Sequence, residues 1–96
     1  MATYVIYQCD VLDAERYEAY KPKAAASVRA AGGRYIVRGG DAEVLEGEAP
    51  AGRTVVVEFP DRETARRWYT GQMYTEARKI REGAATARMY VVDGIA

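Results

Sequence analysis

Several charged and polar side chains stand inside segments that are otherwise apolar, and the residue types present restrict the chemistry they can perform. The 96 residues include no histidine, so the commonest general base near neutral pH and the commonest metal ligand are missing. Cys9 is the only cysteine and lies in a β-forming run, which is typical of a small buried side chain. Any catalysis must therefore use carboxylates, tyrosine, arginine, lysine, this cysteine, or the reactivity of the substrate.

Charged residues within predicted strands form the first group of candidates. Burial of an unpaired charge is costly, so polar residues in β-forming runs call for an explanation. They are Gln8, Arg34, Arg38, Glu58 and Arg88. Glu58 would form a natural ion pair with Arg34 or Arg88, and a structural salt bridge is the more ordinary interpretation. The alternative is that an arginine binds an anionic substrate, such as a carboxylate or an enolate, while Glu58 sets its orientation.

Aromatic residues at helical spacing form the second group. Tyr17, Tyr20, Trp68 and Tyr69 fall on the predicted buried faces of two helices, and for each of them a place in the hydrophobic core is the ordinary explanation. A buried tyrosine hydroxyl nevertheless needs a hydrogen-bond partner. Several hydroxyls that converge between helices and sheet would favour a pocket for a planar phenolic or quinone-like molecule.

A third group has the spacing i, i+4, i+7 on the last predicted helix. Tyr74, Arg78 and Arg81 could edge a cleft that binds an anion, or could form a solvated face on which Arg78 pairs with Glu82. The acidic residues between positions 41 and 48 lack the spacing of a cation site, so they are interpreted as surface charge. No metal site and no cofactor are predicted.

Charge and hydropathy indicate whether the chain is expected to bind nucleic acid or membranes. Lysine and arginine number 14, and so do aspartate and glutamate, so the net charge gives no indication of nucleic-acid binding. No apolar run approaches the length of a membrane span, and the first ten residues lack the features of a signal peptide. These observations predict a cytoplasmic protein that binds neither nucleic acid nor membranes.

Runs of β-branched and apolar residues, separated by turn residues, predict one α+β domain over residues 1–96. Asp13 and Asp61 are the expected N-caps of the helical segments, and Pro22 is expected to bend the first helix near Glu18. The order of elements favours a ferredoxin-like βαββαβ sheet with an extra hairpin and with the helices on one face. The predicted elements are strand 4–9, helix 13–31, strand 34–38, a hairpin strand at 43–46, strand 54–59, two helical pieces on either side of Gly71, and strand 87–92.

The strands are apolar at both residue parities, which has a consequence for assembly. Val55 and Val57 would share one face of the sheet with Phe59, while Val56 and Thr54 would lie on the other. An antiparallel sheet with one solvated face normally alternates between apolar and polar residues. We therefore expect the second face to be covered as well, most simply by a second copy in a homodimer.

Several runs along the chain are distinctive together. They are Tyr4-Val5-Ile6, Asp13 with Arg16-Tyr17 and Tyr20, residues 32–35, residues 38–40, residues 43–47, residues 58–60, Ala65 with Trp68-Tyr69, and residues 81–84. These runs resemble those of the domain-of-unknown-function 1330 family. The resemblance covers nearly the whole chain and implies a dimeric α+β barrel, but it implies no reaction. The wider dimeric-barrel group includes cofactor-independent monooxygenases, lactone isomerases and haem proteins, and the haem branch fits poorly without histidine.

Two functions remain open from the sequence. The first is a homodimer that binds a small aromatic or anionic molecule between sheet and helices and acts as a cofactor-independent oxygenase- or isomerase-like enzyme. In it, Arg34 or Arg88 would stabilise developing negative charge, and a tyrosine or Glu58 would move the proton. The second is a non-enzymatic binding or assembly module whose main act is dimerisation.

Overall fold

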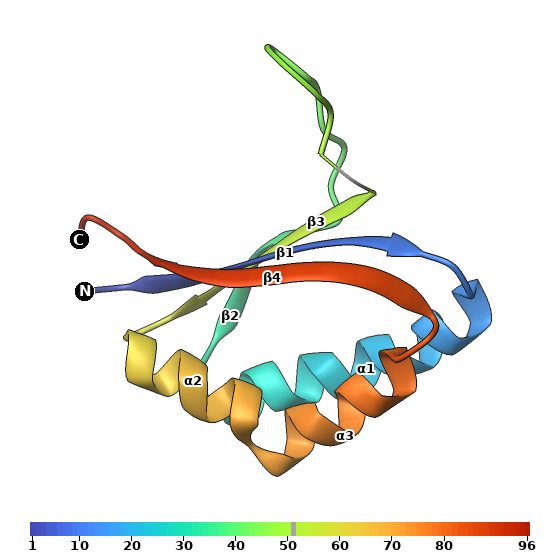
Figure 1. The fold of residues 1–96 in the computed structure, drawn as a ribbon. Coiled ribbons are helices and arrows are strands. Elements are labelled where there is room, and N and C mark those ends of the chain that lie inside the picture. The colour runs from blue at the N-terminus through green and yellow to red at the C-terminus, as the bar shows by residue number, and fades with distance from the viewer. Residues whose placement is uncertain (51) are drawn as a thin grey trace.

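The computed structural model describes residues 1–50 and 52–96, and within them it has four strands and three helices (Figure 1). The elements alternate as the sequence predicts, and the second helical segment is divided in two at Gly71. In chain order they are β1 (Thr3–Val11), α1 (Ala14–Ala30), β2 (Arg34–Arg38), β3 (Arg53–Phe59), α2 (Arg62–Thr70), α3 (Gln72–Arg81) and β4 (Ala85–Asp93).

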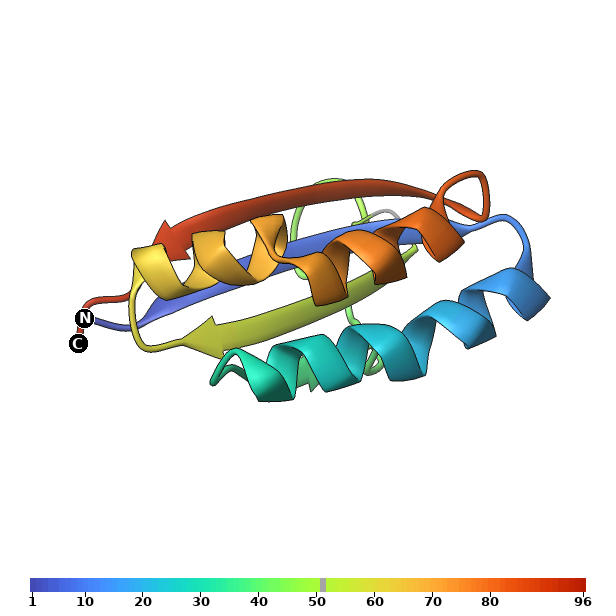
Figure 2. The same cartoon turned by 90° about the horizontal axis from the view of Figure 1, so that it is seen from below.

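The four strands form one antiparallel sheet in the order β2-β3-β1-β4. All three helices cover the same face of this sheet, with α1 beneath the β2 side and α2 and α3 beneath the β4 side (Figures 1 and 2). This two-layer α+β arrangement is the ferredoxin-like fold that the sequence predicts. We call the covered side of the sheet the inner face and the opposite side the outer face.

Local signals explain where the helices begin and end. The carboxylate of Asp13 accepts a hydrogen bond from the backbone N–H of Arg16 at 3.1 Å, and Asp61 caps α2 through the N–H of Thr64 at 2.7 Å. The first helix continues through Pro22 from Ala14 to Ala30, so the bend predicted near Glu18 does not interrupt it. The predicted N-caps at Asp13 and Asp61 are confirmed.

Burial alternates along β1 from Thr3 to Cys9, which separates the inner face from the outer one. Val5, Tyr7 and Cys9 are buried and point toward the helices, whereas Ile6 and Gln8 between them are only partly buried. The inner face packs against buried side chains of the helices to form one core. The core residues are Val5, Tyr7, Cys9, Tyr17, Tyr20, Ala24, Val28, Val55, Val57, Phe59, Ala65, Trp68, Tyr74 and Ala77.

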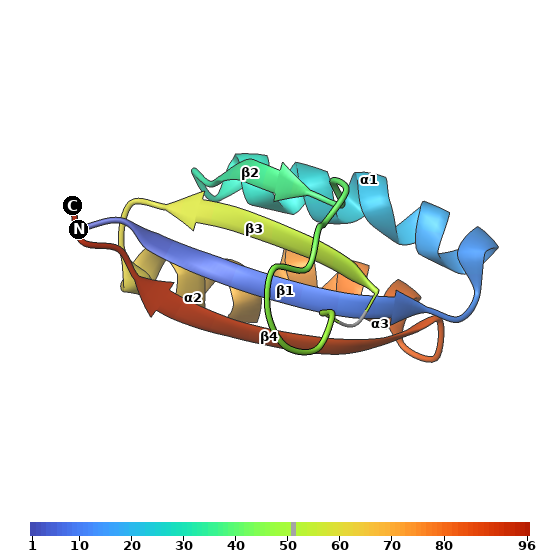
Figure 3. The same cartoon turned by 90° about the horizontal axis from the view of Figure 1, so that it is seen from above.

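The prediction of a hairpin strand at residues 43–46 is wrong. The strand β2 pairs directly with β3, and the backbone N–H of Gly39 donates to the carbonyl of Thr54 at 2.8 Å, which closes that pair. Residues 40–50 instead form an exposed loop that rises from the outer face (Figure 1) and overlies the sheet when viewed from above (Figure 3). The turn residues after β2 are thus those of a long connection to β3, and the other edge of β2 pairs with no described strand.

Membrane insertion has no support in the helices, since none in the described part of the chain is long and apolar enough to cross a bilayer.

Candidate functional site

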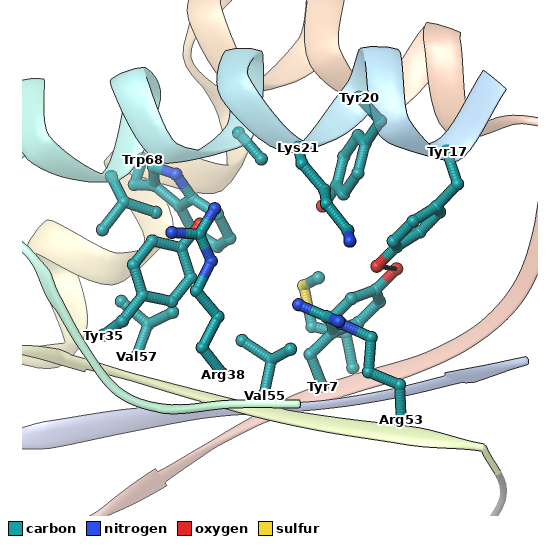
Figure 4. Close-up of a pocket in the computed structure, with 13 residues that line it drawn as sticks. Tyr7, Tyr17, Tyr20, Lys21, Tyr35, Arg38, Arg53, Val55, Val57 and Trp68 are labelled. Carbon is teal, nitrogen blue, oxygen red and sulfur yellow. Dashed lines mark hydrogen bonds between the residues drawn. The ribbon is translucent and has the colours of Figure 1, made fainter. Parts of the chain in front are cut away.

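A small cavity lies between α1 and the inner face of the sheet, on the side where β2 and β3 meet (Figure 4). Its volume is about 30 Å³, which is room for one or two groups the size of a water molecule. Tyrosine hydroxyls and basic side chains provide most of its polar atoms. The lining residues are Tyr7, Tyr17, Tyr20, Lys21, Ala24, Val28, Tyr35, Arg38, Arg53, Val55, Val57, Trp68 and Met89.

Hydroxyl groups from both layers meet beside this cavity. The hydroxyls of Tyr7 on β1 and Tyr17 on α1 lie 3.3 Å apart, and the Tyr17 hydroxyl is also 3.3 Å from the sulfur of Cys9. The hydroxyl of Tyr20 bonds to that of Tyr74 on α3 at 2.8 Å. Each buried hydroxyl thus has a partner, and the chain of phenols joins the sheet to two helices.

Burial keeps these phenols neutral. Desolvation raises the pKa of Tyr17 to about 12, with the neighbouring Cys9 adding to the effect. Burial likewise raises the pKa values of Tyr7, Tyr20 and Tyr74 above the usual range of tyrosine. At neutral pH all four hydroxyls therefore remain protonated and are hydrogen-bond donors rather than bases.

Basic side chains converge on the same space. Arg53 reaches in from the start of β3 and Arg38 from the end of β2, while Lys21 lies above on α1 (Figure 4). Lys21 is paired with Glu18 at 2.6 Å, but neither arginine forms an ion pair within the described residues. The guanidinium of Arg38 stacks over the ring of Tyr35, with Cζ 4.5 Å from the ring centroid.

The position of Arg53 depends on a glycine. Gly39 has a positive φ of 72°, and a Cβ there would lie 2.6 Å from a guanidinium nitrogen of Arg53. A larger residue at position 39 would therefore push the guanidinium of Arg53 away from the backbone. The Nε atom of Arg53 is buried and has no hydrogen-bond partner among the described residues.

The guanidinium group of Arg81 lies close to two of the tyrosine rings. Cζ of Arg81 lies 5.4 Å from the ring centroid of Tyr7 and 5.7 Å from that of Tyr20. Burial disfavours its charged form, but the electrostatic effect of the surrounding tyrosine oxygens outweighs this and raises the pKa of Arg81 above its usual range. Its Nε is also buried and has no hydrogen-bond partner in the described structure.

The balance of charge around the cavity is one-sided. No aspartate or glutamate among the described residues lines it, while Lys21, Arg38 and Arg53 do. Neutral phenol donors and unpaired guanidinium groups both favour negative charge at the point where they converge. No three metal-ligating side chains gather anywhere in the described residues. The arrangement can therefore bind and stabilise a compact anionic group.

Of the aromatic candidates from the sequence, Tyr17, Tyr20 and Trp68 line the cavity. Tyr69 does not, because 38% of its surface is exposed, and it stacks instead beneath Arg78 at 4.5 Å. The expectation that Tyr69 is buried is therefore wrong.

The three residues of the predicted stripe on α3 differ in their surroundings. Tyr74 is buried in the core, where its hydroxyl bonds to that of Tyr20, and it also contributes to the wall of an open pocket beside α1. Arg78 and Arg81 are both partly buried: Arg78 stacks over the ring of Tyr69, and Arg81 turns toward Tyr20. The pair predicted between Arg78 and Glu82 does not form within the described structure.

Three of the charged strand residues named from the sequence lie on the outer face, away from the cavity: Arg34, Glu58 and Arg88. Arg34 and Glu58 form the expected ion pair at 2.6 Å, and the hydroxyl of Tyr4 donates to Glu58 at 3.2 Å. Arg88 is exposed and is opposite Gln8, toward the other end of β1. The pair of Arg34 with Glu58 is thus a surface salt bridge, which contributes little stability.

Of the two arginines that line the cavity, sequence reasoning named Arg38 among the polar strand residues without placing it, and missed Arg53. Arg53 has the same parity as Val55, Val57 and Phe59, all of which are buried, so alternation along β3 was a usable signal. The face of Arg38 could not be predicted, because a register shift between Tyr35 and Val37 turns it to the inner face.

The whole chain matches one protein family. The model of the "Domain of unknown function (DUF1330)" aligns with residues 2–95. The chain belongs to the DUF1330 family. No curated protein matches it.

Solved structures share the fold of this DUF1330 protein at low sequence identity. A protein of unknown function from Rhodopseudomonas palustris has a TM-score of 0.78 at 19% identity, over 99% of this chain and 83% of its own. SnoaB, a cofactor-independent oxygenase from Streptomyces nogalater, has a TM-score of 0.69 at 12% identity, over 99% and 94% of the two chains. A putative antibiotic biosynthesis monooxygenase from Nitrosomonas europaea has a TM-score of 0.62 at 16% identity over the full length of both. At these identities the likeness shows a common ferredoxin-like fold.

Proposed function

We propose that this protein binds a small aromatic molecule with an acidic group, and that it holds the anionic form of that group beneath α1. The observation that carries the proposal is the set of guanidinium groups, unpaired within the described structure, at a cavity that no described carboxylate lines. Arg53 and Arg38 would bind the anion, and the hydroxyls of Tyr7 and Tyr17 would donate to it. The place of the cavity between α1 and the sheet supports a ligand held there.

The chemistry that such a site favours is stabilisation of an enolate or phenolate. An electron-rich anion of this kind reacts with dioxygen or is reprotonated at another carbon, which is oxygenase or isomerase chemistry without a cofactor. The fold shared with a cofactor-independent oxygenase supports the first of these by analogy. The anion-stabilising role moves from Arg34 and Arg88, which lie on the outer face, to Arg53 and Arg38.

Thermal-shift measurements with matched pairs of compounds test the binding. Aromatic acids and hydroxyquinones should raise the melting temperature, because only ligands of the native state do so. The corresponding amides and methyl ethers, which carry no charge, should raise it much less. Arg53→Gln should abolish the response to the acids, whereas Arg34→Gln on the outer face should keep it. An equal loss in both variants, or an equal response to acids and amides, contradicts an anion site at Arg53.

Oxygen consumption distinguishes an enzyme from a binding module. Electron-rich phenols that bind should consume dioxygen faster with the wild type than with Arg53→Gln. Binding without any acceleration of oxygen uptake or of isomerisation would favour the non-enzymatic alternative.

We also propose a second copy of this chain as the partner of the outer face. In the register of the sheet, Val37, Val56, Ile6 and Tyr90 form one row across all four strands. Three of these are aliphatic, and each is partly or largely exposed. The ion pair of Arg34 with Glu58 lies to one side of this row, and Arg88 lies opposite Gln8 on the other. Two copies related by a twofold axis could therefore bury the row and leave these charges at the rim.

Light scattering after size-exclusion chromatography tests this assembly, and should give about twice the mass of the chain. Ile6→Lys should give the monomer, because it places a charge in the middle of the row. Ile95→Lys, at a fully exposed position near the C-terminus, should not. A wild-type monomer at high micromolar concentration would contradict the proposal.

A further inference from the structure

A second, larger cavity lies between α2 and the strand β4, and nothing in the proposed function uses it. Its volume is about 430 Å³, which falls within the range of sites that bind small organic molecules. Apart from the side chains of Arg66 and Thr70, its walls are aromatic or aliphatic. The lining residues are Val5, Ala65, Arg66, Trp68, Tyr69, Thr70, Met89, Tyr90 and Val91.

The two cavities are neighbours on the inner face of the sheet. Val57 lines the first cavity and Val5 the second, and these residues are directly opposite each other on adjacent strands. Trp68 and Met89 belong to the walls of both. The partition between the cavities therefore consists of one indole and one thioether side chain.

The two parts of this partition differ in freedom. The Nε1–H group of Trp68 donates to the hydroxyl of Ser27 at 3.0 Å, and its ring packs against Tyr74 with centroids 4.2 Å apart. Met89 is only partly buried, makes no hydrogen bond and has three rotatable bonds. A change of Met89 rotamer is thus the means by which the two spaces would join, while Trp68 remains a fixed wall.

The smaller cavity has the more polar lining, and the larger cavity has the more apolar one. The first is lined by hydroxyls and guanidinium groups but has space for only a compact group. The second has the space but presents almost entirely apolar walls. In Figure 4, Trp68 lies at the end of the first cavity away from Tyr17 and Arg53, and the guanidinium of Arg38 lies toward the Trp68 end. The phenol hydroxyls of Tyr7 and Tyr17 are therefore at the end farther from the second cavity.

We propose that the ligand is bipartite: an apolar ring system occupies the cavity beside β4, and its acidic group extends past Met89 into the cavity beneath α1. This inference rests on the proposed function, because it assigns the anion site to the acidic end of the same molecule. It narrows the ligand class to lipophilic phenols and carboxylic acids with at least two fused rings or an equivalent apolar body.

Calorimetric titration with 2-naphthoate and benzoate tests the division. Both carry the same acidic group, so both should bind in a manner that depends on Arg53. The naphthoate should bind about tenfold more tightly, since its second ring buries roughly 50 Å² more apolar surface. Val91→Phe, which fills the second cavity, should remove this tenfold advantage and leave benzoate affinity unchanged. Val92→Phe, one residue farther along on the outer face, should preserve the ratio of the two affinities.

The outcomes separate this inference from the proposed function. If both acids bind with equal affinity, or if Val91→Phe leaves the ratio unchanged, the bipartite ligand is refuted while the anion site stands. If neither acid binds, or if both bind without dependence on Arg53, the anion site is refuted and the bipartite ligand with it. Since Trp68 is the only tryptophan, quenching of its fluorescence by the naphthoate but not by benzoate would give independent support.

Discussion

Replacement of Arg53 by methionine should stabilise the free protein and at the same time weaken anion binding. The buried Nε of Arg53 lacks a hydrogen-bond partner in the described structure, and the guanidinium has no acidic neighbour to pair with. Methionine has a similar length and fills the space without a donor or a charge. A side chain retained for ligand binding at the expense of stability should show these opposite effects.

The magnitude follows from the burial of this one group. An unsatisfied buried donor costs about 1–3 kcal/mol, and the lower end applies here because Arg53 is only partly buried. A gain of about 1 kcal/mol in the free energy of unfolding corresponds to a rise in melting temperature of roughly 4–8 °C for a domain of this size. A hydrogen bond to a charged group contributes about 1.5–3 kcal/mol, so the loss of affinity for aromatic acids should be roughly tenfold to a hundredfold.

Urea denaturation and calorimetric titration measure the two effects on the same samples. Arg67→Met is the matched control, because Arg67 is exposed on α2 and forms only surface interactions, a pair with Glu63 at 3.2 Å and a hydrogen bond to the hydroxyl of Thr64 at 3.4 Å. That variant should change the free energy of unfolding by less than about 0.5 kcal/mol and leave affinity unaltered. A less stable Arg53→Met protein with wild-type affinity would refute the reasoning, since Arg53 would then be a structural residue.

Three further predictions concern the core around the site. The raised pKa of Tyr17 adds roughly 2–3 kcal/mol to the free energy of unfolding. This contribution is fully present below about pH 10 and is lost as the pH rises to about 12. Urea titrations should show the loss, and Tyr17→Phe should reduce it. Gly33→Ala should destabilise by roughly 1–3 kcal/mol, because its Cβ would lie 2.6 Å from the buried phenylalanine ring of β3, whereas Gly40→Ala meets open space and should be nearly neutral in thermal melts. Ser27→Ala should cost about 1–3 kcal/mol by leaving the indole N–H of Trp68 without an acceptor, and should shift the tryptophan emission; an unchanged emission would mean that water replaces the hydroxyl.

The order of elements could be predicted because the signals that determine it are local. Asp13 and Asp61 cap their helices through the third residue that follows, and Gly71 divides the second helical segment where it was expected to weaken it. The extra hairpin was wrong because turn residues indicate that the chain leaves a strand, but not which strand becomes the neighbour of β2. That choice depends on contacts between β2 and β3, which are far apart in sequence.

The tyrosines of the candidate site could be predicted from helical periodicity, whereas the sheet face of each charged strand residue was harder to predict. Tyr17 and Tyr20 recur at helical spacing, so their burial beneath α1 was predictable. The strand charges were harder, because both parities of the strands are apolar and one shift of register exchanges the two faces. Arg34 and Arg38 have the same parity in the sequence, yet the bulge between them places Arg34 opposite Glu58 on the outer face and Arg38 opposite Val55 on the inner one.

The protonation state of the groups around the cavity determines how a ligand there would lose its proton. The hydroxyls of Tyr7 and Tyr17 stay protonated because burial raises their pKa values, so they donate to an anion and do not take its proton. No carboxylate in the described structure lines the cavity. The proton of a bound phenol must therefore leave to water, and the guanidinium groups of Arg53 and Arg38 lower the pKa of the phenol by favouring its anion. Across a series of phenols of graded acidity, the pH midpoint of binding or turnover should follow the acidity of each ligand. A midpoint that stays fixed across the series would show that a protein group takes the proton instead.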